Sequence, residues 1–148
     1  MSLNPEFVTP LDVFDFIDTL EDESVSLFVT DPPYMNIVKD SLDNQWKTVQ
    51  DYVDWMYRVL ESMKPKLKQD ASVIFFGGIG KHDQRPFFKV MDKVESRNLY
   101  NYRNMITWMK RKAYGKSHDY LFCREEFVWY SVSPERTEVV FNIPLTND

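Results

Sequence analysis

The residues best suited to chemistry in this chain are Asp31, Pro32, Pro33 and Tyr34, which are consecutive. They place a carboxylate, two prolines and an aromatic ring directly behind the apolar run 25–30, which predicts a buried strand. Proline has no backbone N–H and holds φ at about −65°, so this corner is stiff and presents hydrogen-bond acceptors. In open α/β sheets, ligands bind beyond the carboxyl ends of the strands. The corner therefore suits a site that accepts hydrogen bonds from an amino group and stacks a flat ring.

An aromatic amine, such as the exocyclic amino group of a nucleobase, fits this chemistry. Its lone pair is delocalised into the ring, which makes the nitrogen a poor nucleophile. The Asp31 carboxylate and the Pro32 carbonyl would hold both amino hydrogens, favour a tetrahedral nitrogen and stabilise the positive charge that develops on it. Tyr34 would stack on the base, which has to leave a duplex to enter such a pocket.

The elements that position this corner follow from the apolar pattern. A helix is predicted over 11–20 with Thr9 as its N-cap, and Thr48 begins a helix that ends at Pro65, with Asp51 completing a capping box. The remaining elements are a loop over 35–46, a strand over 71–76, a helix over 86–96 and strands over 100–109 and 125–131. Strand, helix, strand, helix in this order implies right-handed crossovers and parallel pairing. The continuous apolar centre of 71–76 is typical of a strand covered on both faces.

Several segments follow the corner in a recognisable order, namely 72–78, 104–112, 118–120 and 124–130. With these segments the chain, from about Asp12 to Asn142, resembles the bacterial and phage DNA amino-methyltransferases in which Asp-Pro-Pro-Tyr stands near the N-terminus. The resemblance implies an α/β, Rossmann-like S-adenosylmethionine-dependent methyltransferase fold, with a mostly parallel sheet and an antiparallel strand. It also implies transfer of a methyl group from S-adenosylmethionine to the N6 amine of adenine or the N4 amine of cytosine in DNA.

The resemblance assigns roles to individual residues. Asp31, Pro32, Pro33 and Tyr34 correspond to the catalytic residues, and Asp31 and Thr9 would lie against the cofactor, although relatives often carry an acidic or amide residue near Thr9. Adenine is favoured because aspartate at the first position is commoner among adenine enzymes and serine among cytosine-N4 enzymes. Cytosine N4 is the first alternative, and methylation of RNA or a protein amide is the weaker one. A non-catalytic module that kept the fold and binds DNA or a partner is the rival from another class.

The family order also leaves a gap. The target-recognition segment and the cofactor loop would follow Asn142, but the sequence stops at Asp148. The glycine-rich segment 76–80 fits a cofactor loop when taken alone, but its position favours a strand end that lines the base pocket. Residues 1–148 are therefore predicted to be the catalytic half of a methyltransferase domain, as a fragment, a split half or a reduced homologue. A homodimer or a complementary subunit is the expected protein partner.

The distribution of charge supports contact with nucleic acid. The net charge is −5 overall, but residues 1–54 carry a net of −10 and residues 55–148 a net of +5. Lys110, Arg111, Lys112 and Lys116 fall in a stretch without acidic residues, and we expect them to neutralise DNA phosphates. A solvated loop or strand end is the simpler interpretation of the same residues.

Other classes of function find little support. No apolar run approaches a membrane span and no signal peptide precedes the domain, so a cytoplasmic location is expected. The single cysteine, Cys123, fits a reducing compartment. His82 and His118 are far apart and lack partners at ligand spacing, so no metal site is expected. The 43% hydrophobic content predicts one folded domain.

Overall fold

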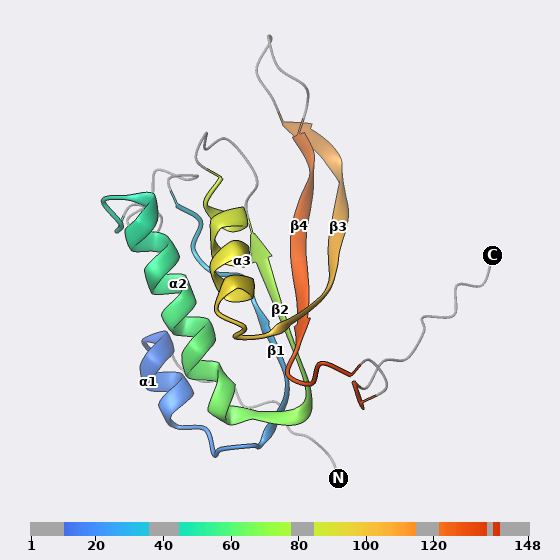
Figure 1. Cartoon of the computed structure of the whole chain (residues 1–148). Coiled ribbons are helices and arrows are strands. Elements are labelled where there is room, and N and C mark those ends of the chain that lie inside the picture. The colour runs from blue at the N-terminus through green and yellow to red at the C-terminus, as the bar shows by residue number, and fades with distance from the viewer. Residues whose placement is uncertain (1–10, 36–44, 78–84, 115–121, 136–137, 140–148) are drawn as a thin grey trace, which may run out of the picture.

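The computed structural model describes residues 11–35, 45–77, 85–114, 122–135 and 138–139. Within these residues the elements are α1 (Val13–Asp18), β1 (Val25–Thr30), α2 (Val49–Met63), a 3-10 turn (Lys64–Lys66), β2 (Leu67–Gly77), α3 (Pro86–Ser96), β3 (Asn101–Tyr114) and β4 (Phe122–Ser131). The helices form one layer against a mixed sheet (Figure 1). The predicted α/β class is confirmed.

The described strands form a four-stranded sheet in the order β1-β2-β4-β3. β1 pairs with β2 in parallel, as the strand–helix–strand order predicted, and Thr30 lies opposite Phe75. β4 is antiparallel to both of its neighbours, β2 and β3. The prediction of a mostly parallel sheet with one antiparallel strand is thus confirmed, and that strand is inserted between β2 and β3.

The starts of α1 and α2 show how local side chains set the helix boundaries. The side chain of Thr48 accepts from the backbone N–H of Asp51 at 3.1 Å, and the Asp51 carboxylate accepts from the Thr48 N–H at 2.9 Å. The predicted capping box is confirmed. The prediction for α1 was wrong by a turn, because Asp12 is the N-cap and accepts from Phe14 N at 2.9 Å. An aspartate placed directly before the apolar stripe is as good a cap as threonine.

The inner stripe of α2 supplies much of the core. Its buried residues recur at helical spacing and are Val49, Tyr52, Val53, Met56, Val59, Leu60 and Met63. They pack with the inward face of β2, which buries Ala71, Val73 and Phe75. Burial of each large apolar side chain contributes about 1.5–3 kcal/mol. The helix ends at Met63, before Pro65, as the sequence predicted.

The β3–β4 pair is longer than the sequence indicated. The strands were predicted over 100–109 and 125–131, but pairing continues to Tyr114 opposite Phe122, with a shift in register after Met109. Residues 110–112 therefore belong to β3, beyond the predicted strand end at Met109. Opposing main chains of an antiparallel pair need no apolar pattern to hydrogen-bond, so a polar end of a ribbon gives little sequence signal. The ribbon extends past the end of β2 (Figure 1).

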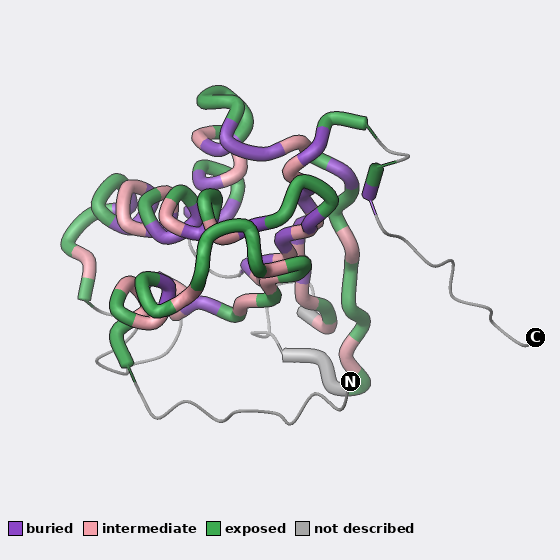
Figure 2. Tube along the Cα trace, turned by 90° about the horizontal axis from the view of Figure 1, so that it is seen from below, coloured by how far each residue is buried: buried purple, intermediate pink, exposed green. Residues whose placement is uncertain are grey.

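The helices of the described residues cover only one face of the sheet. Buried positions gather where the helices meet the sheet (Figure 2). On β2, the residues that face the helices are buried, whereas Ser72, Ile74 and Phe76, which alternate with them, are half-buried. The prediction that this strand is covered on both faces was wrong for the described part of the chain. Right-handed crossovers that advance in one direction across a sheet place their helices on one side, which the apolar pattern of a single strand cannot reveal.

Candidate functional site

The acidic corner lies where the sequence predicted it. β1 ends at Thr30 and Asp31 follows at once, at the carboxyl end of the strand. The neighbouring strand β2 ends nearby at Gly77, which lies opposite Glu126 of β4. The carboxyl ends of β1 and β2 thus lie beside the first part of β4. Open α/β sheets bind their ligands at this end of the strands.

The corner combines a buried proline with an exposed carboxylate. Pro32 is buried, Pro33 and Tyr34 are half-buried, and Asp31 is exposed. The Tyr34 hydroxyl donates a hydrogen bond to Asp31 Oδ1 at 2.5 Å. The sequence analysis did not predict this bond, although a tyrosine three residues after an aspartate across a proline turn has the reach to form it. The bond fixes the carboxylate relative to the aromatic ring.

Several causes raise the pKa of the Tyr34 hydroxyl above its ordinary value. Burial of the phenol is the largest cause, followed by the hydrogen bond to Asp31 and the negative charges of Asp31 and Glu125. The hydroxyl therefore stays protonated, and remains a donor, throughout the neutral range. An ionised carboxylate has about four lone-pair sites, so one bond from Tyr34 leaves acceptor capacity on Asp31 for a ligand.

Aromatic side chains pack beside the corner. Trp46 meets Tyr52 edge-on with ring centroids 4.8 Å apart, and its centroid is 4.9 Å from that of Trp55. Trp46 is partly buried and packs against the core, so it anchors its segment there. Met35, directly after Tyr34, is 3% exposed and belongs to the core. Residues 36–44 of the predicted loop lie outside the described residues.

Gly77 closes β2 against the start of α3. A Cβ atom added to Gly77 would lie 1.7 Å from Phe87 Cδ2, so the ring of Phe87 occupies the space that a side chain would need. Phe87 is 3% exposed and packs edge-on against Phe75. Gly77 therefore serves close packing at the end of the strand. Residues 78–80, the rest of the glycine-rich segment, lie outside the described residues.

The predicted basic residues are only partly placed. Lys110 donates to Glu125 and lies over the ring of Trp108, with its Nζ 5.7 Å from the ring centroid. Arg111 is exposed. The side chain of Lys112, all of Lys116 and all of Thr9 lie outside the described residues.

Glu125 is the residue of this region that the sequence analysis missed. It forms the ion pair with Lys110, and its charge acts on Tyr34. Through these two interactions, Glu125 couples the segment after β1 electrostatically to the β3–β4 ribbon. The signal in the sequence was a pair of adjacent glutamates within an aromatic strand. This pattern does not show whether either carboxylate interacts with other residues or is simply solvated.

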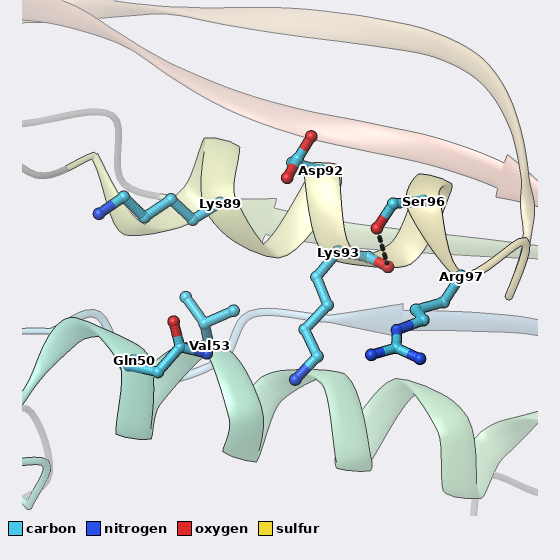
Figure 3. A pocket seen from close by; sticks show the side chains of 7 residues that line it. All are labelled: Gln50, Val53, Lys89, Asp92, Lys93, Ser96 and Arg97. Carbon is cyan, nitrogen blue, oxygen red and sulfur yellow. Dashed lines mark hydrogen bonds between the residues drawn. The ribbon is translucent and has the colours of Figure 1, made fainter.

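A separate groove runs between α2 and α3 (Figure 3). It is lined by Gln50, Val53, Lys89, Asp92, Lys93, Ser96 and Arg97. Lys93 donates to Asp54 at 2.5 Å and lies over the ring of Tyr57. That hydrogen bond is the main cause that lowers the pKa of Asp54. The groove contains no residue of the acidic corner.

In the described part of the chain, no group of His, Cys, Asp or Glu side chains is placed to hold a metal ion. No helix among these residues is both long and apolar enough to cross a membrane.

Comparison with known sequences gives consistent relatives. The chain is 29% identical over 123 residues to the type II methyltransferase M.PvuII of Proteus hauseri, which covers 82% of this chain and 31% of the relative. It is 28% identical over 130 residues to the type II methyltransferase M1.MboII of Moraxella bovis, covering 86% of this chain and 46% of the relative. The chain thus spans less than half the length of either relative.

Solved structures share the fold. The PvuII DNA methyltransferase, described as cytosine-N4-specific, superposes with a TM-score of 0.67 at 19% identity, over 83% of this chain and 48% of that one. M1.HpyAVI in complex with SAM superposes with a TM-score of 0.61 at 20% identity, over 93% of this chain and 59% of that one. The predicted methyltransferase fold is confirmed. The sequence model of the DNA methylase family N6_N4_Mtase matches residues 25–147, and the chain therefore belongs to this family of DNA methylases.

Proposed function

We propose that this chain is the catalytic half of a DNA methyltransferase that transfers a methyl group to the N6 amine of a flipped adenine. The observation that carries the proposal is the Asp31 carboxylate, which is exposed at the carboxyl end of β1 and bonded to the Tyr34 hydroxyl. Membership of the DNA methylase family supports the reaction class. Because the chain spans less than half the length of its curated relatives, the activity of a whole enzyme is part of the proposal.

Asp31 and Pro32 would act on the amino group itself. The carboxylate of Asp31 and the carbonyl of Pro32 accept its two hydrogens, so the nitrogen lone pair leaves conjugation with the ring and points at the incoming methyl carbon. Positive charge grows on the nitrogen as the bond forms, and a fixed carboxylate stabilises that charge most in the transition state. Pro33 limits the backbone motion of the corner.

Tyr34 would have two tasks. Its half-buried ring offers a face for the base, and its hydroxyl holds Asp31 in place. A carboxylate that is already oriented loses less freedom when the substrate binds. The raised pKa of the Tyr34 hydroxyl keeps this donor protonated throughout the neutral range.

S-adenosylmethionine is the proposed cofactor, and when bound it supplies an electrophilic methyl group on a positively charged sulfur. The exposed Asp31 carboxylate fits this cofactor, because a negative charge attracts the positively charged sulfur. Thr9 is the proposed contact for the adenine portion. The chain's own contribution is to hold the amine, attract the cation and stack the base.

DNA is the proposed polymeric partner. Lys110, Arg111, Lys112 and Lys116 are proposed to meet phosphates without reading bases. Exposed Arg111 is the best placed of the described ones, whereas Lys110 shares its charge with Glu125. A homodimer or a complementary subunit remains the proposed protein partner.

Methylation of cytosine N4 is the second candidate. It is supported by the likeness in fold to the cytosine-N4-specific PvuII enzyme and by the sequence relationship to M.PvuII. The aspartate at position 31 favours adenine through family resemblance alone. The chemistry proposed for Asp31 and Pro32 is the same for either amine.

The test is mass spectrometry of nucleosides after the protein has been incubated with duplex DNA and isotopically labelled S-adenosylmethionine. We expect labelled N6-methyladenine, and a loss of about 10²–10³-fold in rate for Asp31→Ala, as for removal of a contact that stabilises transition-state charge. Asp22→Ala, which removes an exposed carboxylate paired with Lys66, is the matched control and should retain the rate. N4-methylcytosine without methyladenine would reassign the base.

A second measurement separates the enzyme from a non-catalytic module. Calorimetric titration with S-adenosylmethionine should show saturable binding if the protein is an enzyme. DNA binding that persists without any cofactor binding would favour the module. Wild-type turnover in Asp31→Ala would remove the proposed role of the carboxylate.

A further inference from the structure

Glu126 is a buried acidic residue of the sheet that the proposed reaction does not use. Its side chain is 2% exposed and alternates along β4 in step with Val128 and Tyr130, which are fully buried. A carboxylate loses its hydration in such a place, and burial is the largest cause that raises the pKa of Glu126. Among the described residues, no donor reaches its Oε2 atom. The carboxylate therefore costs the fold stability, and packing alone does not explain it.

Within the described part of the chain, the ion-pair partner of Glu126 is Arg124. Arg124 Nε lies 2.7 Å from Glu126 Oε1, and the arginine side chain is 53% exposed. Residues two apart on a strand point to the same side, which allows the pair to form. Because the Nε–H donates to the carboxylate, the donors of the two terminal nitrogens are left for another acceptor. The buried carboxylate thus fixes the plane of a guanidinium group that is half in solvent.

Arg124 lies on the part of the β3–β4 ribbon that extends past β2. Pairing between β2 and β4 ends where Gly77 lies opposite Glu126, and the ribbon continues beyond this point (Figure 1). The proposed base pocket is at the carboxyl ends of β1 and β2. A duplex that delivers a flipped base to Asp31 would therefore cross these strand ends and pass beside the extended ribbon. The guanidinium group of Arg124 is thus on the path of a DNA backbone.

A guanidinium group held in this way suits a phosphate group. Arginine presents its N–H donors in a planar fork that matches two phosphate oxygens, and hydrogen bonds between charged groups are strong. Arg124 shares its charge with a carboxylate, but it keeps further donors for a second acceptor. Lys110 of the same ribbon is less suitable, because its ammonium group contacts Glu125 and lies over the ring of Trp108. Lysine also carries a compact charge that does not select a direction.

We propose that Arg124 binds a phosphate group of the DNA backbone and that Glu126 is the positioning residue that orients it. The inference rests on the proposed function, because it takes DNA as the partner. A phosphate contact carries no sequence information, so Arg124 would fix the position of the duplex against the ribbon and not the choice of site. The carboxylate of S-adenosylmethionine is another anion of this shape. It fits less well, because β2 separates β4 from β1, which leads to Asp31.

The test measures how the Kd of the full chain for a short fluorescein-labelled DNA duplex depends on salt, by fluorescence anisotropy. Arg124→Ala alone would leave a buried carboxylate without its partner, so it is combined with Glu126→Gln, and Glu126→Gln alone is the reference. We expect the slope of log Kd against log salt to fall by about 0.9, as for loss of one phosphate contact. Arg97→Ala with Glu126→Gln is the matched control, and its slope should equal that of the reference. It removes the same charge at the end of α3, near the opposite end of β3 from the ribbon extension.

Two further substitutions test the orientation of the guanidinium group. Arg124→Lys keeps the charge but loses the fork, so the slope should stay and the Kd should rise about threefold or more, as for one net hydrogen bond. Glu126→Asp keeps the carboxylate but draws it back from Arg124, and we expect a similar rise in Kd. Combined with Arg124→Lys, Glu126→Asp should add little, because a point charge does not depend on the plane that Glu126 fixes. A purely structural role of Glu126 would weaken DNA binding equally in both chains.

Several results would overturn the proposal. An unchanged slope for Arg124→Ala, or an equal fall for Arg97→Ala, would exclude the phosphate contact, and an equal effect of Glu126→Asp with arginine or lysine at position 124 would exclude the positioning role. Weaker binding of S-adenosylmethionine by Arg124→Ala, with an unchanged slope for DNA, would assign the guanidinium group to the cofactor. Unchanged slopes in a chain that methylates DNA would overturn this inference alone, and absence of DNA binding would also remove the proposed partner. The expected slopes in a chain that methylates no base would uphold this inference and count against the proposed function.

Discussion

Replacing Gly77 with alanine should destabilise the protein through a single contact. The Cβ would lie 1.7 Å from Phe87 Cδ2, less than half the separation of two carbon atoms in contact. Gly77 does not have a positive φ, so the backbone can accept alanine. In an unstrained strand, replacing glycine with alanine would increase the free energy of unfolding by about 0.5–1 kcal/mol. The destabilising part of the effect is therefore steric alone.

The magnitude follows from how firmly Phe87 is held. Its ring is 3% exposed and its centroid lies 5.3 Å from that of Phe75, so the ring cannot swing into solvent. Overpacking of a tight core costs about 1–3 kcal/mol, and the displacement needed here puts the cost near the upper end. After the gain from removing glycine, we expect a net loss of about 2 kcal/mol. In a domain of this size that corresponds to a fall of about 4–8 °C in Tm.

The assay is urea unfolding of the two single variants and their combination. Phe87→Leu alone should be destabilising, because it removes part of a buried ring. The double variant should be more stable than the sum of the single effects predicts, with a coupling of about 1 kcal/mol or more. Additive effects, or a Gly77→Ala variant as stable as the parent, would refute the contact. Ser62→Ala, at a part-buried helix position distant from Gly77, serves as the unrelated control.

Two further predictions concern the pH dependence of stability. The side chain of Glu126 is 2% exposed, and its burial raises the pKa of the carboxyl group. The folded state therefore favours the protonated form. Because the pKa in the unfolded chain is about 4.3, the stability of the fold decreases as the pH rises above that value. Glu126→Gln should therefore raise the urea midpoint at neutral pH and leave it unchanged in acid, and an equal effect at both pH values would contradict this cause. Burial also raises the pKa of Tyr100, whose hydroxyl donates to the Leu60 carbonyl at 2.7 Å, so stability should be lost as pH rises above about 10. Tyr100→Phe should cost about 1 kcal/mol at neutral pH and weaken the alkaline loss, as followed by tyrosinate absorbance and circular dichroism; an unchanged alkaline profile would assign that loss to other tyrosines.

The sequence was most informative where one local interaction decides a boundary. The limits of β1 and α3 were predicted to the residue, because a turn-rich segment precedes the apolar run of β1 and a proline opens α3. Thr48 and Asp51 marked the start of α2 through paired hydrogen bonds that need no distant contact. The corner at Asp31 was also placed correctly, since a stiff turn behind a strand is a local feature.

The sequence was least informative where partners are distant. The ion pair of Lys110 with Glu125 joins two strands across 15 residues, and no pattern in either strand requires it. The bond between Tyr34 and Asp31 depends on how a proline turn directs two side chains. The sequence did not reveal that the described helices cover only one face of the sheet, because an apolar run looks the same whether one side or both are covered. Extension of β3 to Tyr114 depends on a partner strand as much as on its own residues.

The packing of Trp46 with Trp55 has a practical consequence. Two indole rings with centroids 4.9 Å apart couple their electronic transitions, and Tyr52 lies beside both. The charge of Asp31 and a coulombic interaction with Tyr52 both raise the pKa of the Tyr34 hydroxyl. The protein thus carries an intrinsic chromophore next to its acidic corner, and near-ultraviolet dichroism can report a guest there without any label.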